Sequence, residues 1–145
     1  MDQIVERVSV WSASLMDSPG SLSNKLSCLD EAGVDLDFII ARRAPEQPGS
    51  GVVFVSPLRG DHEVRAASTL GFAISSSIAA VRVEGENEPG AAARLTDLIA
   101  DAEINMRGFS GAVVGNRYIA YIGFDSPADA NRAAGIIEEA EAVLA

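Results

Sequence analysis

The chain offers few residue combinations that could perform catalysis. His62 is its only histidine, and it lies between Asp61 and Glu63. A catalytic dyad needs a nucleophile beside a base that a third group orients. His62 could be drawn with Ser56 or Asp61 in that way, but we interpret it as a surface histidine at a helix start. We therefore predict a protein that is not an enzyme, with no catalytic residues.

Metal and cofactor chemistry is equally sparse. Cys28 is the only cysteine, which excludes a disulfide framework, and we interpret it as a small apolar residue on a helix. Glu84, Glu86 and Glu88 alternate, so strand spacing would place them on one face. That face would allow a divalent-ion site, although a solvated edge is the simpler interpretation. We predict no metal and no cofactor.

The charge balance limits the partners. A net charge of −10 repels nucleic acid and anionic membranes, so we expect neither as a partner. The clustered basic pair Arg42-Arg43 is either a solvated hairpin end or a clamp for a carboxylate. The most apolar stretch, residues 70–81, is too short to span a bilayer. No secretory signal pattern opens the sequence, and we expect a cytoplasmic protein.

One turn sequence occurs twice with a constant offset of 70 residues. Asp17-Ser18-Pro19-Gly20 returns as Asn87-Glu88-Pro89-Gly90, and Ser56-Pro57 returns as Ser126-Pro127. A constant offset indicates two copies of one structural unit. We predict domains at residues 1–77 and 78–145. Each is small for an independent core, so the two should pack on each other or on a second chain.

The first copy predicts the element order β-α-β-β-α-β. Strands are expected from alternation and β-favouring residues, and helices from apolar residues at helical spacing. The predicted strands cover residues 4–14, 34–41, 52–55 and 72–76, and the predicted helices cover residues 21–32 and 61–70.

The second copy repeats the order without a final strand. Its predicted strands cover residues 78–83, 105–114 and 117–124, and its predicted helices cover residues 91–102 and 127–144. Gly115-Asn116 suits a tight hairpin turn. The first strand of this unit would then be an open edge. We expect it to pair with the N-terminal strand region, with residues 72–77, or with another chain.

The repeated turn resembles that of the ACT domain. Asp17-Ser18-Pro19-Gly20-Ser21-Leu22 matches the pattern Asp-x-Pro-Gly-x-Leu, and Leu26, Leu29, Ala32, Gly33 and Val34 follow it; residues 87–92 match more loosely. The resemblance implies a tandem ACT domain protein of the α+β class. Its two ferredoxin-like units would have antiparallel sheets with helices packed on one face, and the second unit would lack its own last strand.

The resemblance also implies where a ligand would bind. In this family amino acids often bind at the turn between the first strand and the first helix, against the partner domain's second strand. Helix N–H groups suit a carboxylate, and glycine permits close approach. The residues carried over are Asp17, Pro19, Gly20, Ser21, Leu22 and Asp35 in the first copy, and Asn87, Pro89, Gly90, Ala91 and Asn105 in the second.

Each of these residues also has a purely structural interpretation. In that interpretation Pro and Gly serve only the turn geometry. Asp17 and Asn87 would then cap the following helix, and Asp35 would be an exposed strand residue. Between the two copies, the first matches the pattern better, and we expect it to be the better ligand site.

The resemblance predicts a non-catalytic regulatory protein that binds an amino acid or a related small carboxylate at the domain interface. The expected partners are that ligand, a second copy in a homodimer and a regulated enzyme in trans. The alternative is a protein–protein interaction module that keeps the ACT fold without a ligand pocket. The open strand edge and the looser second turn motivate this alternative.

Overall fold

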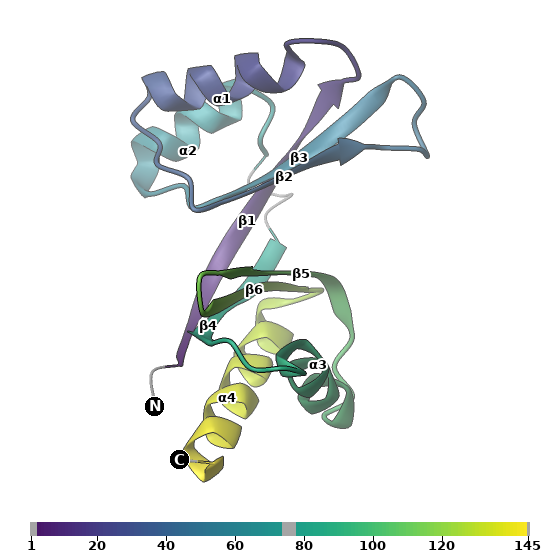
Figure 1. Ribbon diagram of the computed structural model, residues 1–145. Helices are drawn as coiled ribbons and strands as arrows, with labels where there is room; N and C mark the ends of the chain where they lie inside the picture. Colours follow the sequence, from purple (N-terminus) through teal and green to yellow (C-terminus); the bar gives the residue numbers. More distant parts are fainter. Residues whose placement is uncertain (1–2, 74–77, 145) are drawn as a thin grey trace. The chain divides into compact units, whose positions relative to one another are not determined.

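The computed structural model describes residues 3–73 and 78–144, which form two units. The first unit contains residues 9–73, and the second unit contains residues 3–8 together with residues 78–144. Each unit is an antiparallel sheet with two helices on one face (Figure 1). The predicted α+β class with two ferredoxin-like units is confirmed.

The first unit has three described strands in the order β2-β3-β1. Trp11 lies opposite Val55, and Ile40 lies opposite Phe54. Its elements are β1 (Ile4–Met16, shared with the second unit), α1 (Ser21–Glu31), β2 (Phe38–Arg43), β3 (Ser50–Ser56) and α2 (Gly60–Thr69).

Alternate residues of the central strands form the core of the first unit. Val53 and Val55 of β3 are fully buried, and Leu29 of α1, Ala67 of α2 and Phe72 pack with them. Because side chains alternate along a strand, these residues share the face that the helices cover. The helix stripes that periodicity predicted therefore supply this core.

The second unit has the strand order β1-β4-β6-β5. Val81, Leu95, Ile99, Ile122 and Ile137 are among its buried residues. Its elements, beside the start of β1, are β4 (Ile78–Glu86), α3 (Ala91–Asp101), β5 (Met106–Val114), β6 (Arg117–Phe124) and α4 (Pro127–Leu144).

The tight hairpin turn predicted in the second unit is confirmed. The β5–β6 hairpin turns at Gly115, which has a φ of 62°, and Asn116. The backbone N–H of Asp129 donates to the Ser126 hydroxyl at 3.1 Å, so Ser126 caps α4.

The start of β1 covers the edge of β4 in the second unit. The Arg7 Nε donates to the Ala80 carbonyl at 3.3 Å, and Gln3 lies against Gly85. Residue numbers rise along β1 as they fall along β4, so the two strands are antiparallel. Val5 packs on the core of the unit. Of the three partners expected for this edge, the N-terminal strand region is confirmed.

Several strand boundaries differ from the predictions, most clearly at the start of β2. β2 begins at Phe38, because residues 34–37 form a loop in which the Asp37 N–H donates to the Ser56 carbonyl at 2.9 Å. β5 likewise begins after Asn105. Phe72 and Ala73 of the predicted last strand are not in a strand, and the rest of that prediction lies outside the described residues. Within residues 3–73 and 78–144, none of the helices combines the length and apolarity needed to cross a bilayer.

Candidate functional site

The two repeated turns have the same backbone geometry. Gly20 and Gly90 precede α1 and α3 with φ values of 88° and 85°. This left-handed region is easily reached only by glycine. Among the described residues, neither helix start carries a side-chain cap hydrogen bond, so the predicted capping by Asp17 and Asn87 is not made. Ser21 and Ala91 donate their N–H groups to the Ser18 and Glu88 carbonyls at 3.3 and 3.2 Å. In the described part of the chain, the unsatisfied N–H groups of each helix start are therefore those of the next two residues.

Each turn is tied to the hairpin loop of its own unit. The Asp17 N–H donates to the Gly49 carbonyl at 3.0 Å, and the Asn87 N–H donates to the Asn116 carbonyl at 2.7 Å. The repeat thus preserves a long-range contact in addition to the turn sequence. It fixes each helix start beside the loop that joins the unit's two later strands.

The side chains around the first turn are already engaged with one another. Arg43 Nε lies 2.9 Å from the Asp17 carboxylate, and the Ser18 and Ser21 hydroxyls are 2.9 Å apart. Of the two interpretations of the basic pair, Arg43 therefore acts as a carboxylate clamp within the chain. Arg42 lies over the Phe54 ring at 6.0 Å from its centroid.

The cleft beside the first turn is small. It measures about 310 Å³, and Ser21, Asn24, Lys25 and Cys28 contribute to its lining. Cys28 is exposed, so the predicted role as a packed apolar residue is wrong. The Lys25 ammonium donates to the Leu70 carbonyl. Leu22 lines a separate shallow depression on α1.

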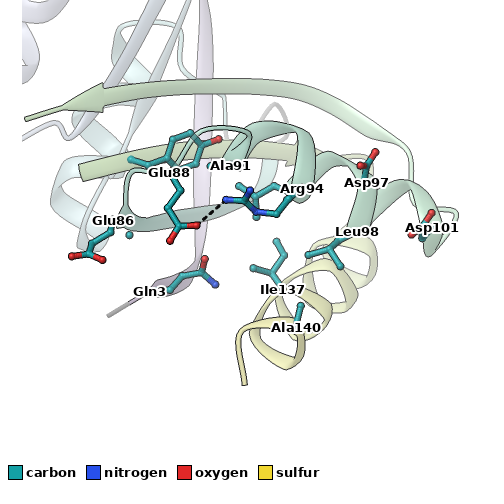
Figure 2. A pocket seen from close by; sticks show the side chains of 13 residues that line it. Gln3, Glu86, Glu88, Ala91, Arg94, Asp97, Leu98, Asp101, Ile137 and Ala140 are labelled. Carbon is teal, nitrogen blue, oxygen red and sulfur yellow. Dashed lines mark hydrogen bonds and ion pairs between the residues drawn. The ribbon is translucent and has the colours of Figure 1, made fainter. Parts of the chain in front are cut away.

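A larger cleft of about 920 Å³ lies beside the second turn. Its apolar lining includes Ala91, Leu95 and Leu98 of α3 with Ile137 and Ala140 of α4. Leu95 and Ile137 are almost fully buried, so they form the floor. Figure 2 shows Leu98, Ile137 and Ala140 between the two helices, with Glu86 toward one end and Asp101 toward the other.

Charged residues of both signs line this cleft. Arg94 forms an ion pair with Glu88, with a nitrogen–oxygen distance of 3.2 Å, and it also donates to the Pro89 carbonyl at 3.1 Å. The Arg94 side chain is 52% exposed and that of Glu88 is 66% exposed. The pair therefore stands in solvent at the mouth of the cleft, next to the start of α3 (Figure 2).

Sequence reasoning missed Arg94. A cation is disfavoured near a helix N-terminus, where the macrodipole is positive, so an arginine one turn into a predicted helix was a usable signal. Tyr118 was also missed. It lines the cleft, its hydroxyl has no hydrogen-bond partner in the described part of the chain, and burial raises its pKa. No motif marked it.

The structure does not bring the remaining predicted residues to the turns of their own units. Asp35 and Asn105 are exposed and follow the C-terminal ends of α1 and α3. Each of those helices has 11 residues, a length of about 16 Å. The expected contact with a turn would therefore have to come from a facing unit.

The three alternating glutamates lie in two different environments. Glu86 and Glu88 line the large cleft, whereas Glu84 is bound by arginines. Glu84 lies on the helix-free face of the second unit, where Arg82 and Arg117 contact it at 2.8 and 3.1 Å. Hydrogen bonds from these arginines lower the Glu84 pKa. Tyr121 accepts a hydrogen bond from Arg82 at 3.1 Å. Residues 3–73 and 78–144 contain no cluster of His, Cys, Asp and Glu that could hold a metal ion.

The structure does not form the catalytic dyad of His62 and Ser56 that we considered from the sequence. His62 is exposed in the first turn of α2. The Ser56 hydroxyl is buried and donates to the Ser9 carbonyl at 2.8 Å. The two side chains therefore lie in different environments, one exposed and one buried.

Comparison with solved structures shows the same fold. A Bacteroides thetaiotaomicron protein superimposes with a TM-score of 0.77 and 14% identity, covering 94% of this chain and 90% of that one. The ligand-free regulatory subunit of aspartate kinase from Thermus thermophilus gives 0.64 and 16% identity, covering 96% of each chain. The aspartate kinase of Clostridium acetobutylicum gives 0.58 and 14%, covering 95% of this chain and 33% of that enzyme.

The sequence itself has no such match. No protein-family model matches the chain, and no curated protein sequence matches it. The structural likeness confirms, at the level of fold, the resemblance to tandem ACT domain proteins that the repeated turn predicted.

Proposed function

We propose that the chain is a non-catalytic regulatory protein that binds a free amino acid beside its second turn. The observation that carries this proposal is the Glu88–Arg94 ion pair, which stands at the mouth of a cleft and next to an uncapped helix start. An amino acid carries the same two charges on groups attached to one carbon atom, so it can replace the internal pair by two external ones.

The head group of the ligand is held by charge exchange. Its carboxylate takes the place of Glu88 on the Arg94 guanidinium and reaches the free N–H groups at the start of α3. Its ammonium takes the place of Arg94 on Glu88. Opening the internal pair costs little, because exposed ion pairs contribute about 0–1 kcal/mol.

The ligand side chain lies on the apolar wall behind the ion pair. Ala91, Leu95 and Tyr118 line this part of the cleft, and the latter two are less than one-tenth exposed. An apolar or amphipathic side chain would remove water from this wall. We infer one ligand per chain, since at the first turn Asp17 is held by Arg43 and the cleft is about 310 Å³.

We also propose a homodimer that pairs sheets edge to edge. β2 and β5 are the outer strands, and they carry Ile39, Val113 and Val114, all at least 44% exposed. Exposed apolar edges favour strand pairing. In such a dimer Asp35 or Asn105 of one copy could approach a turn of the other, and the site residues carried over from the resemblance would meet there.

The regulated target is an enzyme in trans. The similar Thermus thermophilus chain is a regulatory subunit of aspartate kinase and has about the same extent, which supports a regulatory role for this two-unit arrangement. The open strand edge was one reason for the alternative, an interaction module without a pocket. This reason no longer holds, because the start of β1 pairs with the edge of β4.

Ligand binding is tested by thermal shift and calorimetry with the twenty amino acids. We expect at least one to raise the unfolding temperature, and Arg94→Gln to weaken its binding about tenfold, the loss of roughly 1.4 kcal/mol. The matched control is Arg65→Gln, which removes the same charge from an exposed position on α2. No response to any amino acid would contradict the proposal.

A further inference from the structure

The helical end of the large cleft extends well beyond the turn. Ala91 and Asp101, the first and last residues of α3, both line the cleft. The rise of a helix places them about 15 Å apart. A free amino acid at the Glu88–Arg94 pair would occupy the turn end and leave the groove between α3 and α4 open.

The groove has the composition of a docking site for a helix. Leu98 and Ala140, which are partly exposed, form an apolar strip between α3 and α4 whose floor is the buried Ile137 (Figure 2). Asp97 and Asp101, one helical turn apart and both exposed, stand along the α3 side. An amphipathic helix binds such a groove through its apolar face, while its charged residues meet the rim.

The charged residues that line the cleft indicate what kind of partner would bind there. Four carboxylates, from Glu86, Glu88, Asp97 and Asp101, line the cleft against one guanidinium, which is that of Arg94. Glu88 is the partner of that guanidinium, so the other three carboxylates are available to cations. A second copy of this chain fits poorly, because its net charge of −10 would meet an acidic rim.

We propose that the groove between α3 and α4 docks a basic amphipathic helix of a partner protein. Apolar side chains of that helix cover Leu98 and Ala140, and its Lys or Arg residues pair with Asp97 and Asp101. The inference goes beyond the proposed function by naming the surface that would hold a regulated partner. It does not require that an amino acid binds at the second turn.

The test uses the full chain and synthetic peptides. The probe is a fluorescent peptide of about 15 residues, long enough to form a helix, with Leu on one face and Lys on the other. One control peptide has the same composition in scrambled order, and another has Glu in place of Lys. Fluorescence anisotropy should show saturable binding of the patterned Lys peptide alone.

Two protein variants with equal charge change locate the contact. Asp97→Asn with Asp101→Asn should weaken binding about tenfold, as expected for the loss of two exposed ion pairs. Glu138→Gln with Glu139→Gln alters exposed residues of α4 that do not line the cleft, and it should leave binding within about twofold. Circular dichroism checks that both variants are folded.

Three outcomes would overturn the inference: no binding of the patterned peptide, equal binding of the scrambled peptide, or equal weakening by both double variants. The last would mean that the acidic surface attracts the peptide without a specific groove. Binding of spermidine at Asp97 and Asp101, without binding of the peptide, would assign the groove to small cations instead and overturn it too. A flat thermal shift with every amino acid beside specific peptide binding would contradict only the proposed function.

Discussion

Glycine at the end of each repeated turn is required by the backbone. Gly20 and Gly90 both have φ values above 80°, and a Cβ there costs roughly 1–2 kcal/mol. We expect Gly20→Ala and Gly90→Ala each to lower the free energy of unfolding by about 1 kcal/mol. Urea denaturation measures this change.

Gly135 provides a control with the opposite sign. It lies inside α4 without a positive φ, and a Cβ there would meet no atom within 4 Å. Gly135→Ala should therefore stabilise the chain by roughly 0.5–1 kcal/mol. If all three substitutions changed stability in the same direction, the assignment of backbone strain to the two turns would be wrong.

Glu84 gives the chain a pH-dependent contribution to stability. Its lowered pKa means that folding favours the ionised form, so the contribution is full above the unfolded value of about 4.3 and is lost as pH falls through the folded pKa. We expect Glu84→Gln to cost about 1 kcal/mol near neutral pH. The gap to the unsubstituted chain should close on acidification, as followed by urea denaturation across pH.

The control for this effect is Glu138→Gln, which changes an exposed carboxylate of α4. It should shift stability by less than about 0.5 kcal/mol at every pH. A gap for Glu84→Gln that persisted below the folded pKa of Glu84, where both states are protonated, would argue against the charge network and for a packing effect.

Residue types near the turns could be predicted, but their pairings could not. Pro and Gly specify a local backbone, so the turn conformation followed from the sequence. The Asp17–Arg43 pair depends on where β2 ends relative to the first turn. The Glu88–Arg94 pair depends on the direction in which α3 leaves the second turn. Both are products of tertiary geometry that local patterns do not contain.

The start of β1 is a structural element of the second unit, and its two faces should respond differently to charge. Val5 packs on the core, whereas Ile4 is 43% exposed. We expect Val5→Asp to destabilise the second unit by about 2 kcal/mol or more, because a carboxylate would be placed against apolar residues. Hydrogen exchange of the β4 amides should accelerate accordingly.

Ile4→Asp is the matched control on the neighbouring residue, and we expect it to change stability by less than about 0.5 kcal/mol. Equal effects of the two substitutions would mean that the start of β1 does not face the core as an ordered strand.

Element types followed from periodicity, while several strand boundaries and one strand pairing did not. Residues 34–37 alternate like a strand, yet they form a loop because Val34 is buried after the end of α1 and Asp37 bonds to Ser56. The partner of the β4 edge could be narrowed only to three candidates, since several β-favouring segments were equally suited to it. Long-range packing determines which of these segments pairs with β4.

At the scale of the whole molecule, edge pairing predicts a dimer. We expect light scattering to give twice the mass of one chain. Val113→Lys or Ile39→Lys should shift the equilibrium toward the monomer, because lysine on an outer strand opposes pairing. Ala100→Lys makes the same charge change at an exposed position of α3, away from the outer strands, and should leave the mass unchanged. A monomeric unsubstituted chain would contradict the proposed assembly.

Because β1 is divided between two units, the order in which its residues are synthesised differs from the order in which the two units can be completed. Residues at the start of β1 bond to partners that are synthesised much later, as in the contact between Arg7 and Ala80, 73 positions apart. The described elements of the first unit all emerge between those two events. A nascent chain can therefore assemble much of the first unit while the second unit still waits for β4. The start of β1 is thus synthesised before the first unit and reaches its final position after it.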